Sequence, residues 1–181
     1  MTMQLRIAAA DLIDLQDTVP VGAADAGIAA PAPAADAPVT GGLARGTVIL
    51  TMRGEVPVEE LAAGDRVITR ERGMSVLRAV ERVEAPAVSV RADSLGLGRP
   101  ERDTTVAAGQ HVAVRDWRAE ALFGHEAALV PARRLADGAQ VAAFGCAAFY
   151  RLVLDAPLTV YANGLETPTG RTETGVVALP A

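Results

Sequence analysis

Short apolar runs separated by turn residues make up most of the chain after residue 42. The runs are rich in Val, Leu and Ile, and Gly, Pro, Asp and Asn bound them at intervals typical of an all-β domain. The pattern predicts strands at 47–51, 66–70, 75–83, 88–92, 104–108, 111–115, 139–144, 149–154 and 158–162. The sequence therefore favours an all-β fold class for this region.

Two segments depart from the strand pattern. Residues 58–61 (VEEL) have the length of one helical turn, and residues 120–135 contain LVPARRL, which places a proline where a short helix would begin. Asn163-Gly164, between two apolar runs, predicts a tight hairpin, because a type I′ turn needs positive φ at both central residues. The turn explains this pair without the succinimide chemistry to which Asn-Gly is prone.

The composition changes near residue 19, and the chain divides into four parts. Residues 1–18 form an N-terminal arm whose apolar stretch, 3–15, is too short for periodicity to distinguish strand from helix. Residues 19–41 are almost wholly Ala, Pro, Gly and Val, so they bury too little area to fold and are expected to form a semi-extended linker. Residues 42–170 are the expected folded domain, and residues 171–181 a C-terminal tail.

The 181 residues suffice for an ordinary core without disulfides or metal. Half of them are hydrophobic but only 3% are aromatic, so we expect a core of Val, Leu, Ile and Ala. No apolar run is long enough to span a membrane, and Asp11, Asp14 and Asp17 interrupt the N-terminal run where a signal peptide would carry no charge. The sequence thus predicts a soluble protein without a signal peptide, either cytoplasmic or exported without a leader.

The charged residues exclude several kinds of chemistry. All 17 basic residues are arginine, which excludes Schiff-base and P-loop lysines. The net charge is −5 and the arginines are scattered among acidic residues, so the basic stripe of a nucleic-acid-binding protein is missing. His111, His125 and Cys146 are too few and too far apart for a zinc site. We expect no cofactor, metal or nucleic acid, and a partner that is either another protein or the chain's own N-terminal arm.

Three blocks of the sequence carry a recurring order of motifs. Residues 42–69 contain Gly46-Thr47, Gly54, the VEEL turn and Gly64-Asp65; residues 105–117 contain His111; and residues 150–168 end in the Asn-Gly hairpin. This order resembles the Hint superfamily, the fold shared by hedgehog autoprocessing domains and inteins, and especially its bacterial stand-alone branch. The resemblance implies a Hint-type horseshoe of short strands, with one or two short helical turns, over residues 42–170.

Autoprocessing in this family begins when a side-chain thiol or hydroxyl attacks the preceding carbonyl. The resemblance assigns the nucleophile's position to Gly42, which has no side chain, and Thr40 lies two residues out of register. Only His111 matches the family's catalytic pattern. The other positions where the family carries catalytic groups hold Ala108, Arg151, Leu158 and Thr167-Pro168.

The resemblance therefore predicts a Hint domain that has lost splicing and serves as a non-catalytic binding or scaffold module. The vacated cleft around Gly42, His111 and Arg151 is the expected binding surface, where an arginine would favour a carboxylate. His111 is then a relic, hydrogen-bonded at the start of a strand. One alternative is a residual self-cleaving domain in which His111 activates water near Gly41-Gly42. Another is a structural subunit of a larger assembly.

Several polar residues outside these motifs are expected to have structural roles. Cys146, between small residues, is predicted to be a small buried hydrophobe. Asp155 is predicted to be a turn residue and His125 to lie in a solvated loop. For Arg133-Arg134 a surface ion pair with Asp137 is favoured over an anion site.

Overall fold

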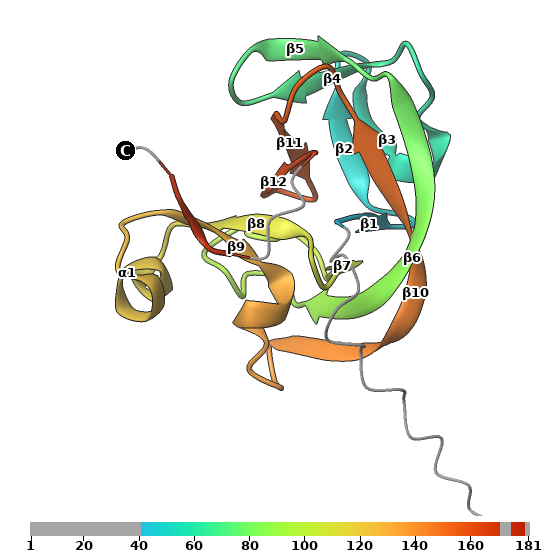
Figure 1. The fold of residues 1–181 in the computed structure, drawn as a ribbon. Coiled ribbons are helices and arrows are strands. Elements are labelled where there is room, and N and C mark those ends of the chain that lie inside the picture. The colour runs from blue at the N-terminus through green and yellow to red at the C-terminus, as the bar shows by residue number, and fades with distance from the viewer. Residues whose placement is uncertain (1–40, 171–174, 180–181) are drawn as a thin grey trace, which may run out of the picture.

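The computed structural model describes residues 41–170 and 175–179, and strands dominate this part of the chain (Figure 1). The helical elements are α1 (Trp117–Phe123) and the 3-10 turns η1 (Val58–Glu60) and η2 (Ala132–Leu135). The strands are β1 (Leu43–Ala44), β2 (Val48–Thr51), β3 (Gly54–Pro57), β4 (Arg66–Thr69), β5 (Gly73–Val76), β6 (Ala79–Val90), β7 (Thr104–Ala107), β8 (His111–Val114), β9 (Ala128–Pro131), β10 (Val141–Val153), β11 (Thr159–Ala162), β12 (Leu165–Pro168) and β13 (Val177–Ala178). The predicted all-β class is confirmed. The predicted N-terminal arm, and the linker up to residue 40, lie outside the described residues.

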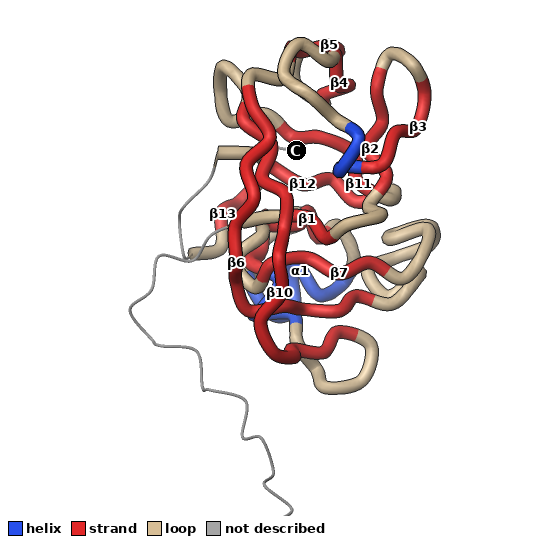
Figure 2. The backbone as a smooth tube through the Cα atoms, turned by 90° about the vertical axis from the view of Figure 1, so that its right-hand side faces the viewer, coloured by secondary structure: helices blue, strands red, loops and turns tan. Residues whose placement is uncertain are grey.

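Two long strands, β6 and β10, form the frame of the domain. They pair antiparallel from Val141↔Val90 to Val153↔Ala79, with one shift in the ladder between Phe144 and Cys146. Figure 1 shows the pair as a curved ribbon, and Figure 2 shows both strands running side by side along the height of the domain. We call this pair the β6–β10 ribbon.

The remaining strands are arranged in two lobes along the ribbon. In the first lobe, one sheet has the order β12-β11-β2-β4-β5, and β3 pairs with β2. In the second lobe, β1, β10, β6 and β7 close into a small barrel, beside a three-stranded sheet β13-β9-β8. Strand β1 therefore lies where the two lobes meet (Figure 1).

The core is built from aliphatic residues, as predicted. Its main cluster includes Ile49, Val67, Leu77 and Val112, all fully buried. A second cluster packs Phe149 against the small side chains of alanines in β6 and β7. Among the described residues, no helix has the length and apolar character needed to cross a membrane.

Several predicted strand boundaries were wrong because long-range pairing overrides local signals. The predicted strand 75–83 is split: Leu77 N–H donates to the carbonyl of Asp65, whereas Arg78 N–H donates to that of Val153, so the chain changes partner there. Conversely, the predicted strand 88–92 is the end of β6, which stops at Val90. The predicted strands 139–144 and 149–154 are joined in one strand, β10, which runs from Val141 to Val153 through Gly145.

The helical predictions were only partly right. The turn at 58–61 is confirmed as η1, and the proline-initiated turn as η2, preceded by β9. Helix α1 was not predicted, although its ends carry recognisable signals. The Asp116 side chain accepts from the N–H of Arg118, and Gly124 ends the helix with φ of 71°.

The predicted hairpin is confirmed. Asn163 and Gly164 have φ of 47° and 79°, and the pair Ala162↔Leu165 flanks them. The buried Asn163 side chain accepts from the N–H of Val48 at 2.9 Å and donates to Thr104 Oγ1 at 2.9 Å. The β11–β12 hairpin is thereby attached to β2 and β7.

The surface predictions had mixed outcomes. Cys146 is exposed, so its predicted burial was wrong; the shift in the β6–β10 ladder falls at this residue. His125 is exposed, as predicted, and Asp155 lies at a bend.

The predicted ion pair of Arg133-Arg134 with Asp137 was wrong for the described residues. The Asp137 carboxylate accepts backbone N–H groups of residues 139–141 instead, and Arg134 lies over the ring of Phe123 at 5.9 Å.

Replacing Gly164 with alanine is expected to destabilise the domain more than replacing Gly138. Both residues have positive φ, at a cost of about 1–2 kcal/mol to alanine. At Gly164 the added Cβ would also lie 2.7 Å from the carbonyl oxygen of Gly98, whereas nothing lies within 4 Å at Gly138. In urea unfolding, the free energy of unfolding should fall by about 1–3 kcal/mol more for Gly164→Ala than for Gly138→Ala. Equal losses for the two variants would contradict the packing described here.

Candidate functional site

A cleft of about 370 Å³ opens where the two lobes meet. Its wall combines the entry of the chain into β1, the middle and end of β10, and the end of β12. Of the residues predicted for the site, Arg151 and Thr167-Pro168 line it, together with Gly41. The cleft therefore joins segments that are more than a hundred residues apart in sequence.

Gly42 is buried beside this cleft and is held by the barrel. Its carbonyl accepts the N–H of Ala107 at 2.9 Å, and the next residue, Leu43, pairs with Val106 and Tyr150. A Cβ at position 42 would lie 2.7 Å from the Cβ of Phe149 and 3.5 Å from Val83 Cγ2. The first distance is shorter than carbon contacts in proteins, and a Cβ cannot rotate away. Position 42 thus has no space for a side chain unless the backbone moves.

His111 is the first residue of β8 and is 1% exposed. Its Nε2 lies 2.9 Å from the carbonyl oxygen of Gly175, which can only accept, so the Nε2–H donates; in the neutral ring Nδ1 then carries the lone pair. Nδ1 is buried and has no hydrogen-bond partner in the described part of the chain. The His111 side chain therefore ties the segment before β13 to the sheet, and it does not line the cleft.

Ala108 and Leu158 are both buried and offer no polar side-chain atom. The backbone of Ala108 donates to the carbonyl of Pro86 and accepts from the N–H of Arg133. The Leu158 carbonyl accepts from the Thr169 hydroxyl at 2.9 Å, and the hydroxyl of Thr167 donates to the carbonyl of Val160 at 3.3 Å. The hydroxyl groups at this end of the cleft are thus engaged with the backbone.

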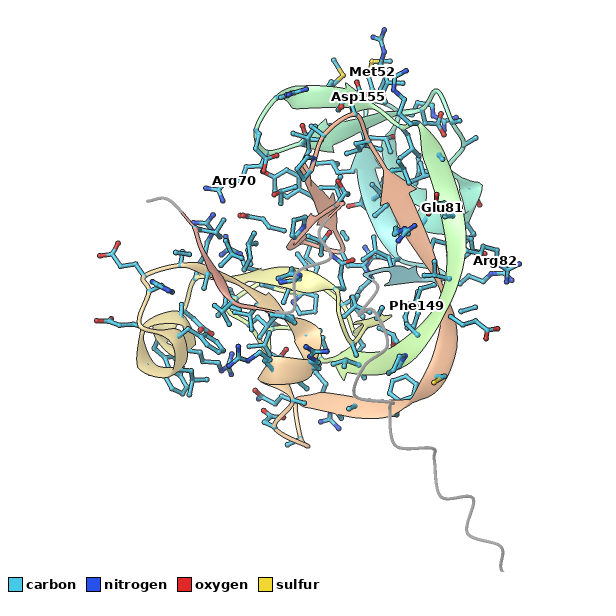
Figure 3. All side chains as sticks on the ribbon, in the orientation of Figure 1. Met52, Arg70, Glu81, Arg82, Phe149 and Asp155 are labelled. Carbon is cyan, nitrogen blue, oxygen red and sulfur yellow. The ribbon has the colours of Figure 1, made fainter. Side chains whose placement is uncertain are left out.

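The positive charge of Arg151 is neutralised by a glutamate of the same domain. It lies directly opposite Glu81 in the ribbon, and both its Nε, at 2.9 Å, and its Nη2 donate to Glu81 Oε2. Figure 3 shows Glu81 on the stretch of the ribbon that borders the cleft. Both side chains are about two-fifths exposed, at 39% and 44%. A carboxylate ligand at Arg151 would have to compete with Glu81.

Asp155 is the other acidic residue at the cleft. A hydrogen bond from Arg78 lowers the pKa of Asp155; burial acts in the opposite direction, and the charges of Arg78 and Arg72 add to the lowering. The same bond raises the pKa of Arg78. Asp155 therefore stays ionised at neutral pH and is a weak base, so it is poorly suited to take a proton from a nucleophile.

Gln110 is a polar residue of the site that the sequence analysis missed. It is buried, and its Nε2 donates to the carbonyls of His111 and Pro168, each at 3.0 Å. Its Oε1 faces Gly41, where a Cβ would lie 2.7 Å from it. Gln110 thus connects the turn before β8 to the end of β12. No local pattern marks Gln110, because its partner Pro168 lies 58 residues away in the sequence.

Within residues 41–170 and 175–179, no three His, Cys, Asp or Glu side chains come together as a metal site would require. Besides backbone and aliphatic side chains, the cleft is lined by the Gln110 amide, the Arg151–Glu81 pair, Asp155, Tyr150 and the hydroxyls of Thr167 and Thr169.

Comparison with known proteins bears on this arrangement. A family model described as a Hint domain matches residues 42–172. No curated protein matches the chain.

Among solved structures, the DnaB intein from Synechocystis sp. PCC 6803 matches with a TM-score of 0.50 and 10% identity, over 73% of this chain and 100% of that chain. The gp41-1 intein has a TM-score of 0.48 and 12% identity, over 71% and 98% of the two chains. The MchDnaB-1 intein has a TM-score of 0.48 and 15% identity, over 71% and 99%. At 10% identity, the match to the Synechocystis intein shows a shared fold and says nothing about activity.

Alanine is expected to be tolerated at position 41 but not at position 42. A Cβ on Gly41 meets only the flexible end of Gln110, whereas a Cβ on Gly42 meets the Cβ of Phe149. Gly42→Ala should lower the free energy of unfolding by about 1–3 kcal/mol, and Gly41→Ala should change it by less than about 1 kcal/mol. Urea unfolding of the two variants measures this difference. A Gly42→Ala variant as stable as Gly41→Ala would show that position 42 has room for a side chain.

Proposed function

Because the chain belongs to the Hint domain family, we propose that it is a Hint domain that has lost autoprocessing and acts as a non-catalytic binding or scaffold module. The observation that carries this proposal is the environment of position 42. The residue there has no side-chain heteroatom, and a nucleophilic side chain would begin 2.7 Å from the Cβ of Phe149. A fold keeps its shape without its chemistry when the reacting group is gone.

The other requirements of an acyl shift are also poorly met. A nucleophile needs a base, yet the hydrogen bond from Arg78 lowers the pKa of Asp155 and makes its carboxylate a weak base. The tetrahedral intermediate needs donors that are not already engaged, yet Arg151 donates to Glu81 and the Thr167 and Thr169 hydroxyls donate to carbonyls. Arg151, Thr167 and Thr169 thus have hydrogen-bond partners within the fold.

The cleft is the binding surface of this proposed module. Its lining includes the aliphatic residues Leu43, Leu152 and Val160, and the Gln110 amide oxygen accepts no hydrogen bond from residues 41–170 or 175–179. Since Glu81 already meets the charge of Arg151, the cleft favours an uncharged, apolar segment of a partner protein over a carboxylate. Such a segment would donate one backbone N–H to Gln110 Oε1.

One observation favours a second function, residual self-cleavage near Gly41-Gly42. The Nδ1 atom of His111 is an acceptor without a partner among the described residues, as a base must be. One base contributes about two to four orders of magnitude, far less than amide hydrolysis needs. Nδ1 is also buried away from the cleft, where water would have to enter. Self-cleavage is therefore the weaker proposal.

The intact mass of the purified full-length chain tests the two proposals against each other. For the non-catalytic module we expect an unchanged mass over several days at neutral pH. A fragment that begins at Gly42, accumulating in the wild type but not in His111→Ala, would establish self-cleavage and overturn the main proposal. His125→Ala is the matched control, because His125 is exposed and distant from Gly42 in sequence.

A further inference from the structure

The β4–β5 hairpin and the neighbouring β2–β3 turn present an exposed surface of methionine and arginine. Met52 and Met74 are 57% and 50% exposed. The N–H of Met52 donates to the Arg66 carbonyl at 3.0 Å, which attaches this turn to β4. A depression of about 380 Å³ is lined by Arg66, Arg72, Met74, Ser75, Val76 and Asp155. We call Met52, Arg66, Arg72, Met74 and Val76 the hairpin surface; Figure 3 shows Met52 at the outer end of this lobe.

The hairpin surface carries unbalanced positive charge. The nearby Arg53 and Arg78 are paired with Asp65 and Asp155. Arg66 and Arg72 are exposed and form no ion pair within the described ranges. Methionine and arginine are both enriched in the buried parts of protein interfaces. The surface is therefore suited to a segment that combines apolar side chains with carboxylates.

The chain itself contains such a segment. Residues 11–17 read DLIDLQD, in which three aspartates are interspersed with Leu12, Ile13 and Leu15. The whole stretch before Gly41 contains five Asp, no Glu and one Arg. Its negative charge and its apolar residues both match the hairpin surface.

We propose that residues 11–17 dock on the hairpin surface of the same chain. The Ala/Pro-rich residues 18–40 can span about 70 Å when extended, whereas a domain of this size has a radius of gyration of about 14 Å, so reach is not limiting. A tether of this kind gives an effective concentration of the order of 1 mM, so a contact too weak to hold a free peptide suffices. The docking does not depend on the proposed loss of autoprocessing, because the surface includes no neighbour of Gly42.

A second apolar surface competes for the same segment. Helix α1 exposes Trp117 and Leu122, at 69% and 59%. Charges of both signs lie on and beside this helix, since Arg118 pairs with Asp116, Glu120 is in its first turn and Arg134 lies over its Phe123. Charge therefore favours the hairpin surface for an acidic segment. The two sites can be distinguished by NMR, because Trp117 is the single tryptophan of the chain and its indole signal reports on α1.

Paramagnetic relaxation in the full-length chain tests the docking. In a Cys146→Ser background, a nitroxide is attached through Gln16→Cys, and the methionine methyl groups are observed by NMR. The control label is attached through Ile28→Cys, nearer to the domain along the chain. If the arm were undocked, the label at position 28 would broaden the methionine signals more than the label at position 16. Docking predicts the opposite order, with broadening of Met52 and Met74 about threefold greater from position 16.

Charge reversal provides the matched variants. Arg66→Glu/Arg72→Glu should remove the excess broadening, and Arg91→Glu/Arg133→Glu, which makes the same charge change at exposed residues of the second lobe, should retain it. Salt at about 1 M should also remove the excess, because it shortens the screening length to about 3 Å.

Three results would overturn the proposal. The first is broadening from position 16 that does not exceed the broadening from position 28. The second is excess broadening that disappears when the labelled chain is diluted into unlabelled chain, which would make a second copy the occupant. The third is preferential broadening of the Trp117 indole signal, which would make α1 the docking site.

Discussion

The antiparallel pairing of β6 with β10 is the constraint on which the rest of the domain depends. It fixes Phe149 opposite Val83 and Arg151 opposite Glu81, and both lobes are attached to the ribbon that it forms. Strand β1 pairs with β10 directly, so the ladder also decides what lies next to Gly42. The ribbon thus determines the fold and the contents of the site together.

The pairing of β6 with β10 also determines which side chains meet at the site. The same strand that brings Phe149 against Gly42 supplies Arg151, whose partner Glu81 comes from the other half of the ribbon. Gln110 joins the turn before β8 to the end of β12, so its amide stabilises the junction of the lobes. A buried polar group is costly when unpaired, and here nearly all such groups near the cleft are paired. The site is therefore a packed junction of the two lobes, with the cleft beside it.

Part of the fold and of the site could be predicted from the sequence, through local turn rules and the spacing of the family's motifs. Asn163-Gly164 needs positive φ at two adjacent residues, which identifies the hairpin without tertiary information. The motif spacing was enough to mark Gly42 and Arg151, which the fold brings to one junction. The continuity of β10 through Gly145, the exposure of Cys146 and the contact of Gly42 with Phe149 depend on partners far away in sequence. No short-range pattern encodes these features, and Gln110 was missed for the same reason.

The central claim is that position 42 provides neither a nucleophile nor the space for one. Its most direct test is the full-length Gly42→Cys variant, whose folded fraction is treated with excess thiol and followed by mass spectrometry. Because the new Cβ would lie 2.7 Å from the Cβ of Phe149, the variant should lose stability and give no thiol-dependent fragment. Prompt scission of the peptide bond that precedes position 42, in a stably folded variant, would show that the machinery of autoprocessing is intact and would contradict this account.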